Sequence, residues 1–532
     1  MLWKIYRENI DPVIKILHVP TTEILVRDAS NGLVQGDSSS SVLLVAICYA
    51  AVTSMDDEEV TVQFGLQRLH MLSQYRLALE QALLEANFLR KADLASLQGL
   101  VLFLTTARGQ EISRMCWSLT GLVVRLAQSI QIHRDGVSLG IPPFETEMRR
   151  RLWWTICTLD LQFSEELGMD LAITPGSFDT ELPSNINDFD IWRGMVAMPI
   201  PRLGQTDCTI ARIRYEFCAL WRRLYTSSST MASMSPADDS LTLTEWERLV
   251  VDLYRQMKGK FLDSYSLDQD HLFRMVAVVL RAIMAKMVLV VYRPKFRGTA
   301  ALSSEVRNNL WLVAIEIVEC HRNLDTSPEY RPWRWLFQSH MQWNAVAYIL
   351  GESMSRPWTA ISERAWELAV RLLDGKTEES DGIETTDNAV KNPLPTLFME
   401  TRKHREAEIA RLRADPEAAR LLDAEDDLAE RSIFSGFVRG KTQELSQIHD
   451  RWRSLVGQKD HNSVLPSQTK VDSRMSAAVA STEATDLCSP VQPVLTPEQQ
   501  AEIVEQVLAT NTDPSEIWQY VSAASMRVES PW

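Results

Sequence analysis

Apolar residues recur every three to four positions along most of the chain, which is the period of a helix with one buried face. Residues 66–90 and 111–132 both show this rhythm. Proline is favoured in the first turn of a helix, so a third amphipathic helix is predicted to begin after Pro142 and Pro143. Its apolar stripe consists of Met148, Leu152, Ile156, Leu159 and Phe163.

The same period predicts further core helices in the second half of the chain. Their expected ranges are 245–262, 270–292, 304–324, 333–352 and 360–374. Two stretches lack the period. Residues 173–209, rich in proline, asparagine and glycine, are expected to form a long loop, and the polar residues 227–240 a hinge or an insert without regular structure.

The composition changes after Gly375. Residues 376–460 are rich in charged residues and alanine, which predicts a charged helical arm with few core side chains. Residues 461–495 have the Ser, Thr and Pro content of a flexible linker. In residues 496–532, Thr496 and Asp513 each combine a helix-capping side chain with a following proline, so two short helices are expected there.

Overall composition supports a helical protein. Hydrophobic residues make up 45% of the chain, and Trp (16) and Met (19) are plentiful while Gly (20) and Pro (22) are scarce. This balance favours a helical interior. Composition and periodicity together predict an all-α fold, with one large helical domain in residues 1–375 and a partly disordered carboxy-terminal tail.

The charge and the cysteines limit how the chain can meet nucleic acid. The formal net charge is −15, and little direct DNA binding is expected because DNA affinity comes from Lys and Arg that neutralise phosphates. A zinc clip of the form Cys-x-x-Cys has two residues between its cysteines. No such pair exists among the seven cysteines, which stand at positions 48, 116, 157, 208, 218, 320 and 488. Unclustered cysteines suit a reducing compartment.

No membrane association is expected. The first residues lack the basic start and apolar centre of a secretory signal, so the protein is predicted to remain inside the cell. The most apolar long segment, residues 272–292, contains Arg274, Arg281 and Lys286. It is therefore predicted to be a buried helix and not a membrane span.

The run Arg149-Arg150-Arg151, followed by Trp153 and Trp154, has two interpretations. Arginines with neighbouring rings can form a nucleic-acid patch. However, the run lies beside Glu145, Glu147 and Asp160 in an acidic chain. The favoured interpretation places the arginines on the outward side of a helix, in a structural ion-pair network, and the tryptophans at its apolar face.

The sequence His133-Arg134-Asp135-Gly136 could suggest catalysis, but consecutive residues at a helix end point in different directions. A structural interpretation is preferred, in which Gly136 ends the preceding helix and His133 and Arg134 lie near the negative end of its dipole. The chain has no Gly-rich phosphate loop, no His-Glu-x-x-His and no Gly-x-Ser-x-Gly. These absences exclude several common enzyme classes.

Acidic residues leave one enzymatic alternative open. Inward-facing carboxylates of a helical fold can hold magnesium and a diphosphate. The metal ligands would be Asp56 and Asp57, and the catalytic acids Asp160, Glu165 and Glu166. Acidic clusters in such a chain are more often solvated or helix-capping groups. No other cofactor is implied.

Several motifs occur together in a fixed order. They comprise His133, Arg134, Asp135, Gly136, Arg149, Arg150, Arg151, Trp153, Trp154, Asp179, Pro183, Asn185, Asn187 and Asp188. Residues 1–375 thereby resemble the regulatory middle-homology domain of fungal zinc-cluster transcription factors. The resemblance is extended by Asn9-Ile-Asp-Pro12 and His18-Val-Pro near the start and by Trp333-Arg-Trp335 and Gln342-Trp-Asn-Ala345 later.

The resemblance implies an all-helical regulatory body that acts in the nucleus and controls transcription, often of metabolic or secondary-metabolite gene clusters. Two departures matter: Asn344 stands where relatives commonly have histidine, and no zinc cluster is present in these residues. The second departure is consistent with an incomplete gene model, a partner-dependent regulator, or a helical domain recruited to another task.

The main hypothesis is therefore a fungal transcription regulator that reaches DNA through a DNA-binding transcription factor or promoter complex. Residues 514–520, acidic with interleaved aromatics, could bind a coactivator or dock on the body. The competing hypothesis is a biosynthetic enzyme on the same fold, such as a magnesium-dependent terpene cyclase. Convergence of the acidic residues on one cavity would favour the enzyme.

Overall fold

A computed structural model gives the architecture of the chain. It describes residues 1–33, 38–107, 113–231, 270–296, 304–338, 343–374, 394–432 and 442–457, with the isolated positions 248, 252, 255, 256 and 259. These residues form helices and connecting loops, and none of them forms a strand. The prediction of an all-α fold is confirmed.

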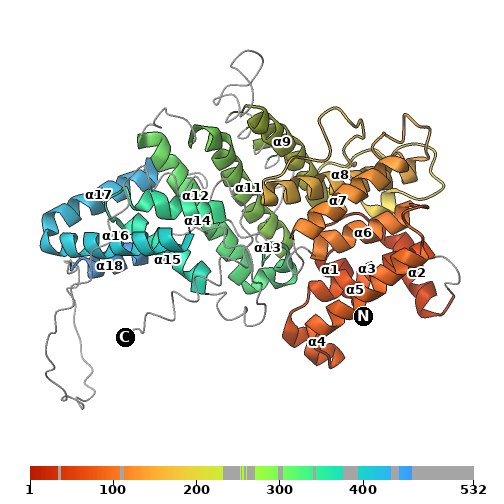
Figure 1. Cartoon of the computed structure of the whole chain (residues 1–532), viewed down its shortest axis with the longest axis horizontal. Helices are drawn as coiled ribbons and strands as arrows, with labels where there is room; N and C mark the ends of the chain where they lie inside the picture. The colour runs from red at the N-terminus through yellow and green to blue at the C-terminus, as the bar shows by residue number, and fades with distance from the viewer. Residues whose placement is uncertain are drawn as a thin grey trace.

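The amino-terminal helices gather at one end of the molecule, on the right in Figure 1. They are α1 (Leu2–Asn9), α2 (Val19–Ser30), α3 (Ser38–Thr53), α4 (Asp57–Phe64), α5 (Arg68–Glu85), α6 (Leu94–Ala107), α7 (Ser113–Ser129) and α8 (Pro143–Leu167). The periodic stretches 66–90 and 111–132 correspond to α5 and α7, and the helix predicted after Pro142 and Pro143 is α8.

Helix α8 is the central element of this half. Pro143 occupies its first turn, and Gly168 ends it in the left-handed conformation, with a φ of 65°. Most of the helix between these two ends is buried, including polar residues, so it has neighbours on nearly its whole circumference.

A long loop, residues 169–208, follows α8 and contains only the short 3-10 turn η1 (Asp188–Asp190), as the lack of periodicity predicted. The chain then continues through α9 (Thr209–Met231), α11 (His271–Phe296), α12 (Ser304–Thr326), η3 (Pro328–Trp333), α13 (Trp335–Gln338), α14 (Trp343–Ser353), α15 (Ala360–Asp374), α16 (Leu394–Ala414), α17 (Pro416–Ser432) and α18 (Thr442–Leu455).

The predicted helix 333–352 corresponds to α13 and α14 in the described residues, and residues 339–342 between them lie outside the described part. Trp333, its predicted first residue, is the last residue of η3, which contains Pro332. The predicted helices 270–292, 304–324 and 360–374 correspond to α11, α12 and α15.

Several predictions fall outside the described residues. They concern residues 232–240 of the predicted insert, nearly all of the helix 245–262, the linker 461–495 and the helices of 496–532. For the start of the insert, residues 227–231, the prediction of no regular structure is wrong, because α9 continues to Met231. In α11, Leu280, Met284 and Met287 are buried, in agreement with the prediction for 272–292. Within the described part of the chain, no single helix combines the length and apolarity needed to cross a membrane; only the bent pair α3 and α4 meets that composition, and most of α3 is core.

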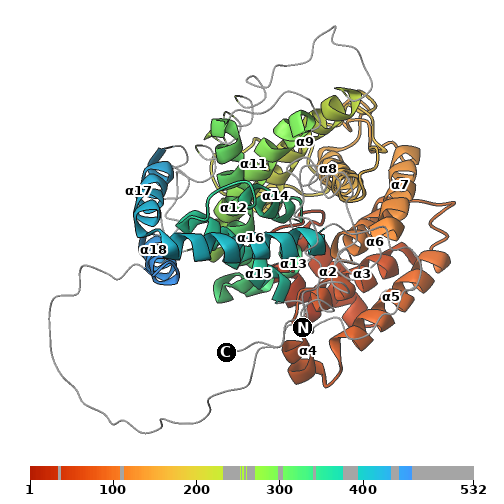
Figure 2. The same ribbon diagram turned by 60° about the vertical axis from the view of Figure 1, so that its left-hand side comes forward.

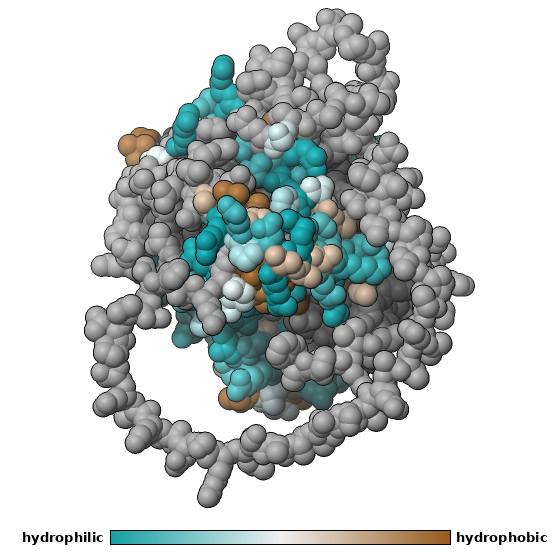
Figure 3. All heavy atoms as spheres, turned by 90° about the vertical axis from the view of Figure 1, so that its left-hand side faces the viewer, coloured by the Kyte–Doolittle hydropathy of each residue, from teal (hydrophilic) through white to brown (hydrophobic). Residues whose placement is uncertain are grey.

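Two large hydrophobic clusters divide the interior. The first joins α1–α9 and the amino-terminal part of α11, and the second joins α12, α14 and α15 with α16–α18. Figure 2 shows α16–α18 along one side of the second group. The described parts of the charged stretch, 394–432 and 442–457, consist mainly of α16, α17 and α18. They place more side chains in the core than the composition suggested: Leu397, Leu412 and Trp452 are fully buried. In Figure 3, which views the molecule from this side, most of the coloured residues are hydrophilic.

The α3–α6 contact requires a glycine. A Cβ atom at Gly99 would lie 2.8 Å from Val42 Cγ1 and 3.1 Å from the Val42 carbonyl oxygen. Because one of these atoms is backbone, the two helices would have to separate. We expect Gly99→Ala to destabilise the protein by about 1–3 kcal/mol, measured as a lower midpoint of thermal unfolding.

Gly121 of α7 provides the matched control, because no atom lies within 4 Å of a Cβ placed there. Gly121→Ala should leave the protein unchanged or stabilise it by up to about 1 kcal/mol through helix propensity. Equal unfolding midpoints for the two variants would show that the close approach at Gly99 is unimportant.

Candidate functional site: a buried ion-pair network

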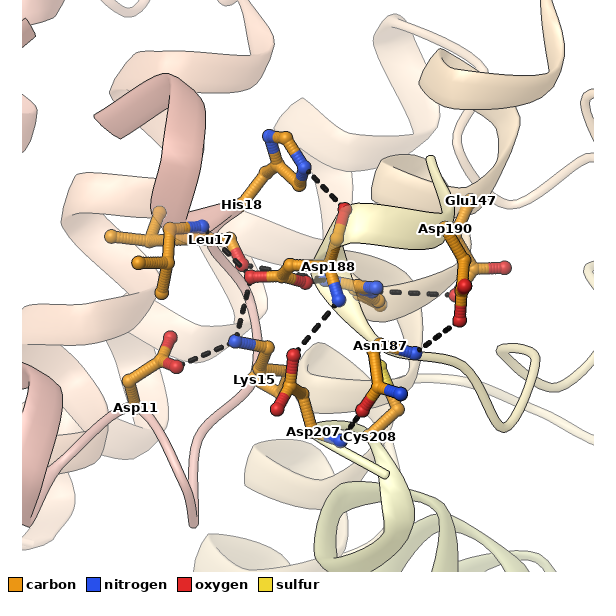
Figure 4. A network of polar contacts seen from close by, with 12 residues as sticks. Asp11, Lys15, Leu17, His18, Glu147, Asn187, Asp188, Asp190, Asp207 and Cys208 are labelled. Carbon is orange, nitrogen blue, oxygen red and sulfur yellow. Dashed lines mark hydrogen bonds and ion pairs between the residues drawn. The ribbon is translucent and has the colours of Figure 1, made fainter. Parts of the chain in front are cut away.

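Asp188, the last residue of the sequence signature, is the centre of a buried polar network (Figure 4). One carboxylate oxygen accepts from Arg151 Nη1 at 2.8 Å, and the other lies 2.8 Å from both Lys15 Nζ and the Val19 N–H. The Asp188 carbonyl oxygen lies 2.8 Å from His18 Nε2. The loop after α8 is thereby joined to α8 and to the segment between α1 and α2.

The charges in this network are almost fully removed from water. The side chain of Arg151 is 1% exposed, and its second carboxylate partner, Glu147, lies one helical turn earlier at 3.3 Å. Lys15, 2% exposed, also contacts Asp11 at 2.5 Å. Unpaired, such charges would cost several kcal/mol each, so the partners are a condition for folding.

The electrostatic environment holds these groups in their charged states. Burial opposes the charge of Asp188, but Arg151 and Lys15 outweigh it and keep the pKa of the carboxyl well below its usual value. Burial likewise opposes the charge of Arg151, but the carboxylates of Asp188 and Glu147 face it and hold its pKa above the usual range. Burial raises the pKa of Cys208 to about 12, so this thiol is neutral.

A second ion-pair cluster lies one residue earlier on α8. The guanidinium of Arg150 donates to both oxygens of Asp135 at 2.8 Å, and to Glu181 at 2.8 Å. Asp135 also accepts from the Glu181 N–H at 3.0 Å, and its own N–H donates to Asp179 at 2.8 Å. Hydrogen bonds and ion pairs thus connect residues 133–136 with residues 179–181, and both segments with α8.

The structural interpretation of the arginine run is confirmed, but the predicted outward position is wrong for two of the three residues. Arg150 and Arg151 are buried, whereas Arg149 is half-buried and pairs with Glu145 at 2.7 Å. Asp160 is not part of this group, since its partner is Arg222 of α9 at 3.0 Å. The tryptophans do lie in the core, Trp153 at 0% and Trp154 at 6% exposure.

The role predicted for Gly136 is also wrong. Helix α7 ends at Ser129, and the residue with a left-handed backbone after it is Gln131, with a φ of 61°. Gly136 is needed for another reason: a Cβ there would lie 2.3 Å from Thr146 Oγ1 on α8. His133 packs against Trp153, with ring centroids 6.1 Å apart.

The remaining signature residues shape the loop itself. Asn185 donates to the carbonyl oxygens of Arg202 at 2.9 Å and Gly204 at 2.8 Å, which closes the loop on itself. Asn187 Oδ1 accepts from the Asp207 N–H at 3.0 Å. Pro183 is buried, and its carbonyl oxygen accepts from Arg212 of α9.

The acidic residues of the enzymatic alternative do not converge. Asp56 caps α4 and pairs with Arg331, while Asp57 is 82% exposed beside Arg68. Asp160 is bound by Arg222, Glu165 pairs with Lys286 at 2.8 Å, and Glu166 is half-buried. No group of three potential metal ligands exists in the described ranges. This geometry gives no support to a magnesium-dependent enzyme.

Sequence reasoning missed Asp11, Lys15 and Glu181 as members of the network. The motif Asn9-Ile-Asp-Pro12 was noted only as a resemblance. The sole local indication was the spacing of four residues between Asp11 and Lys15, which also fits an ordinary surface pair. Their partner Asp188 is far away in the sequence, so periodicity carries no information about the contact.

We expect Asp188→Asn to destabilise the protein by about 3–5 kcal/mol, because Arg151 and Lys15 would remain buried without their shared carboxylate. Thermal unfolding at neutral pH measures the effect. Asp190→Asn is the control, since Asp190 pairs with the half-exposed Arg202 and should cost at most about 1 kcal/mol. A similar loss in both variants would contradict the central role of Asp188.

Comparison with known proteins identifies a domain in the amino-terminal half of the chain. Residues 3–255 match the family described as the fungal specific transcription factor domain. This range contains both ion-pair clusters and the loop between α8 and α9. Both ion-pair clusters therefore lie inside the matched domain.

Curated relatives point the same way. The chain is 28% identical over 386 residues to the transcriptional regulator AacuB of Aspergillus aculeatus, covering 71% of this chain and 52% of the relative. It is 28% identical over 380 residues to the aurofusarin cluster transcription factor aurR2 of Gibberella zeae, covering 70% and 55%. The chain spans about half the length of these curated relatives. Residues 3–255 are thus a fungal specific transcription factor domain, and the curated relatives that the chain resembles are fungal transcription regulators.

Proposed function

We propose that the chain is a nuclear transcription regulator of a fungal biosynthetic gene cluster. The observation that carries the proposal is the domain match over residues 3–255. Two relatives support the cluster role by name, the aurofusarin cluster transcription factor aurR2 and the pyriculol/pyriculariol biosynthesis cluster transcription factor 1 of Pyricularia oryzae. Both are about half covered by this chain, so their role is extended to it as a proposal.

We further propose that these 532 residues reach promoters through a DNA-binding protein. The net charge of −15 disfavours a broad contact with phosphates. The most basic run, Arg149-Arg150-Arg151, is turned toward Glu145, Asp135 and Asp188 and leaves little charge for DNA. The described basic residues thus support contacts within the fold more than contacts with a duplex.

An exposed apolar segment in the loop between α8 and α9 supports contact with a protein. Trp192, Val196, Ile200 and Leu203 are 58%, 96%, 88% and 100% exposed. The loop that presents them is closed by hydrogen bonds of Asn185 and by the ion pair between Arg202 and Asp190. Large apolar side chains that are exposed within one loop are available for contact with a protein. We assign this surface to the promoter-bound partner.

Disruption of the coding gene should change transcripts of the biosynthetic genes near its locus several-fold, measured by quantitative RNA analysis. The purified chain should give no sequence-specific footprint on their promoters at physiological salt, because its acidic charge opposes duplex binding. A specific footprint by the chain alone would reject the partner-mediated mechanism. Unchanged transcripts would reject the regulatory function.

The loop surface can be tested with the tagged full chain by chromatin immunoprecipitation at the promoters of these genes. If the loop contacts the promoter-bound partner, Ile200→Asp with Leu203→Asp should lower promoter occupancy by about tenfold, as expected when a contact worth about 1.4 kcal/mol is lost. Leu77→Asp with Leu84→Asp on α5 is the matched control, since these leucines are 68% and 75% exposed. Equal effects of the two double variants would show that the loop does not form the contact with the partner.

A partner contact through residues 514–520 remains a separate proposal, and these residues lie outside the described part of the chain. The acidic and aromatic side chains there fit a groove of a coactivator.

A further inference from the structure

The network around Asp188 contains one more acidic group than it has cations. Its buried acids are Asp11, Glu147 and Asp188, and its buried cations are Lys15 and Arg151. None of the five side chains is more than 8% exposed. With every group ionised the cluster would hold an unbalanced negative charge, which is unfavourable away from water.

The hydrogen bonds identify the acid that is least supported. Asp188 accepts from Arg151, Lys15 and the Val19 N–H, so both of its oxygens are occupied. Glu147 accepts from Arg151 and from the Ser184 N–H at 3.2 Å. Asp11 has only Lys15, on Oδ2, while its buried Oδ1 has no partner. A proton on Asp11 Oδ1 removes the surplus negative charge of the cluster. It disturbs fewer hydrogen bonds than a proton on Asp188 or Glu147 would.

We propose that Asp11 is a proton-operated latch, which closes the segment between α1 and α2 onto the loop after α8 when protonated and loosens it when ionised. Burial, opposed in part by Lys15, raises the pKa of Asp11 to about 6. The change of charge therefore falls between mildly acidic and neutral pH.

No neighbouring group supplies the missing charge. Tyr6 is fully buried near Asp11, and burial holds its pKa well above the usual value, so it stays neutral. Burial lowers the pKa of His18, so its ring is neutral near pH 7. Asp207, which accepts from the Asp188 N–H, adds a further carboxylate at the exposed edge. Arg214 of α9 is fixed on the Val13 carbonyl oxygen at 2.7 Å.

The direction of the pH effect follows from proton binding. The pKa of Asp11 is higher in the closed state than in an opened one, so a proton is taken up on closing. The stabilisation is fully present below the usual pKa of an aspartate and is lost as the pH rises through about 6. Asp188 behaves oppositely, because its lowered pKa favours closure until the pH becomes strongly acidic.

Hydrogen exchange on the full chain tests the latch. The measured quantity is the equilibrium constant for opening of amides 10–17, corrected for the intrinsic exchange rate at each pH. We expect this constant to increase by about tenfold from about pH 5 to about pH 7, because Asp11 loses its proton with a pKa of about 6 in the closed state. Asp11→Asn mimics the protonated acid and should abolish this dependence while the protein stays closed at both pH values. Asp57→Asn, at an acid that is 82% exposed, should retain the full tenfold change.

The proposal is overturned if the wild-type amides open equally at both pH values, or if Asp11→Asn keeps the dependence. Glu147→Gln gives a second measurement should the asparagine variant fold poorly. It removes the surplus charge at another residue, so the midpoint of the pH dependence should move to lower pH. An unchanged midpoint would also reject the latch. None of these outcomes depends on the proposed role in transcription.

Discussion

The buried pairing of Arg151 with Asp188 is the constraint on which the amino-terminal half depends. A guanidinium without water is tolerated only where carboxylates and carbonyl oxygens surround it. Asp188, Glu147 and the Leu17 carbonyl oxygen provide that surrounding from three separate parts of the chain. Meeting this requirement brings the segment after α1, the helix α8 and the loop after it to one place. Sheet hydrogen bonds perform the same organising task in other folds; here a charged residue does so.

Local and long-range features differed in how well they could be predicted. The helices α5, α7 and α8 follow from apolar spacing, because that information lies within a few residues. The ion-pair network is different, since Arg151 lies 37 residues from Asp188 and 134 from Leu17. A single sequence contains no measure of such distances.

The errors on α8 have a common cause. Periodicity separates a buried from an exposed face only when the helix has an exposed face. Because α8 is enclosed on nearly all sides, its arginines were assigned outward although Arg150 and Arg151 point into the protein. Gly136 was misjudged for a related reason, since its close approach to Thr146 is a tertiary contact and not a property of the helix end.

The loop after α8 combines the two properties that a regulatory contact needs. At its inner side Asp188 is locked to Arg151 and Lys15, and at its outer side Ile200 and Leu203 are exposed. Only short spans of sequence separate these sides, and the side-chain bonds of Asn185 connect them. A partner bound as proposed would therefore contact a segment whose position is set by buried charges. Because packed ion pairs have few alternative arrangements, such a contact either fits the closed network or favours its opening.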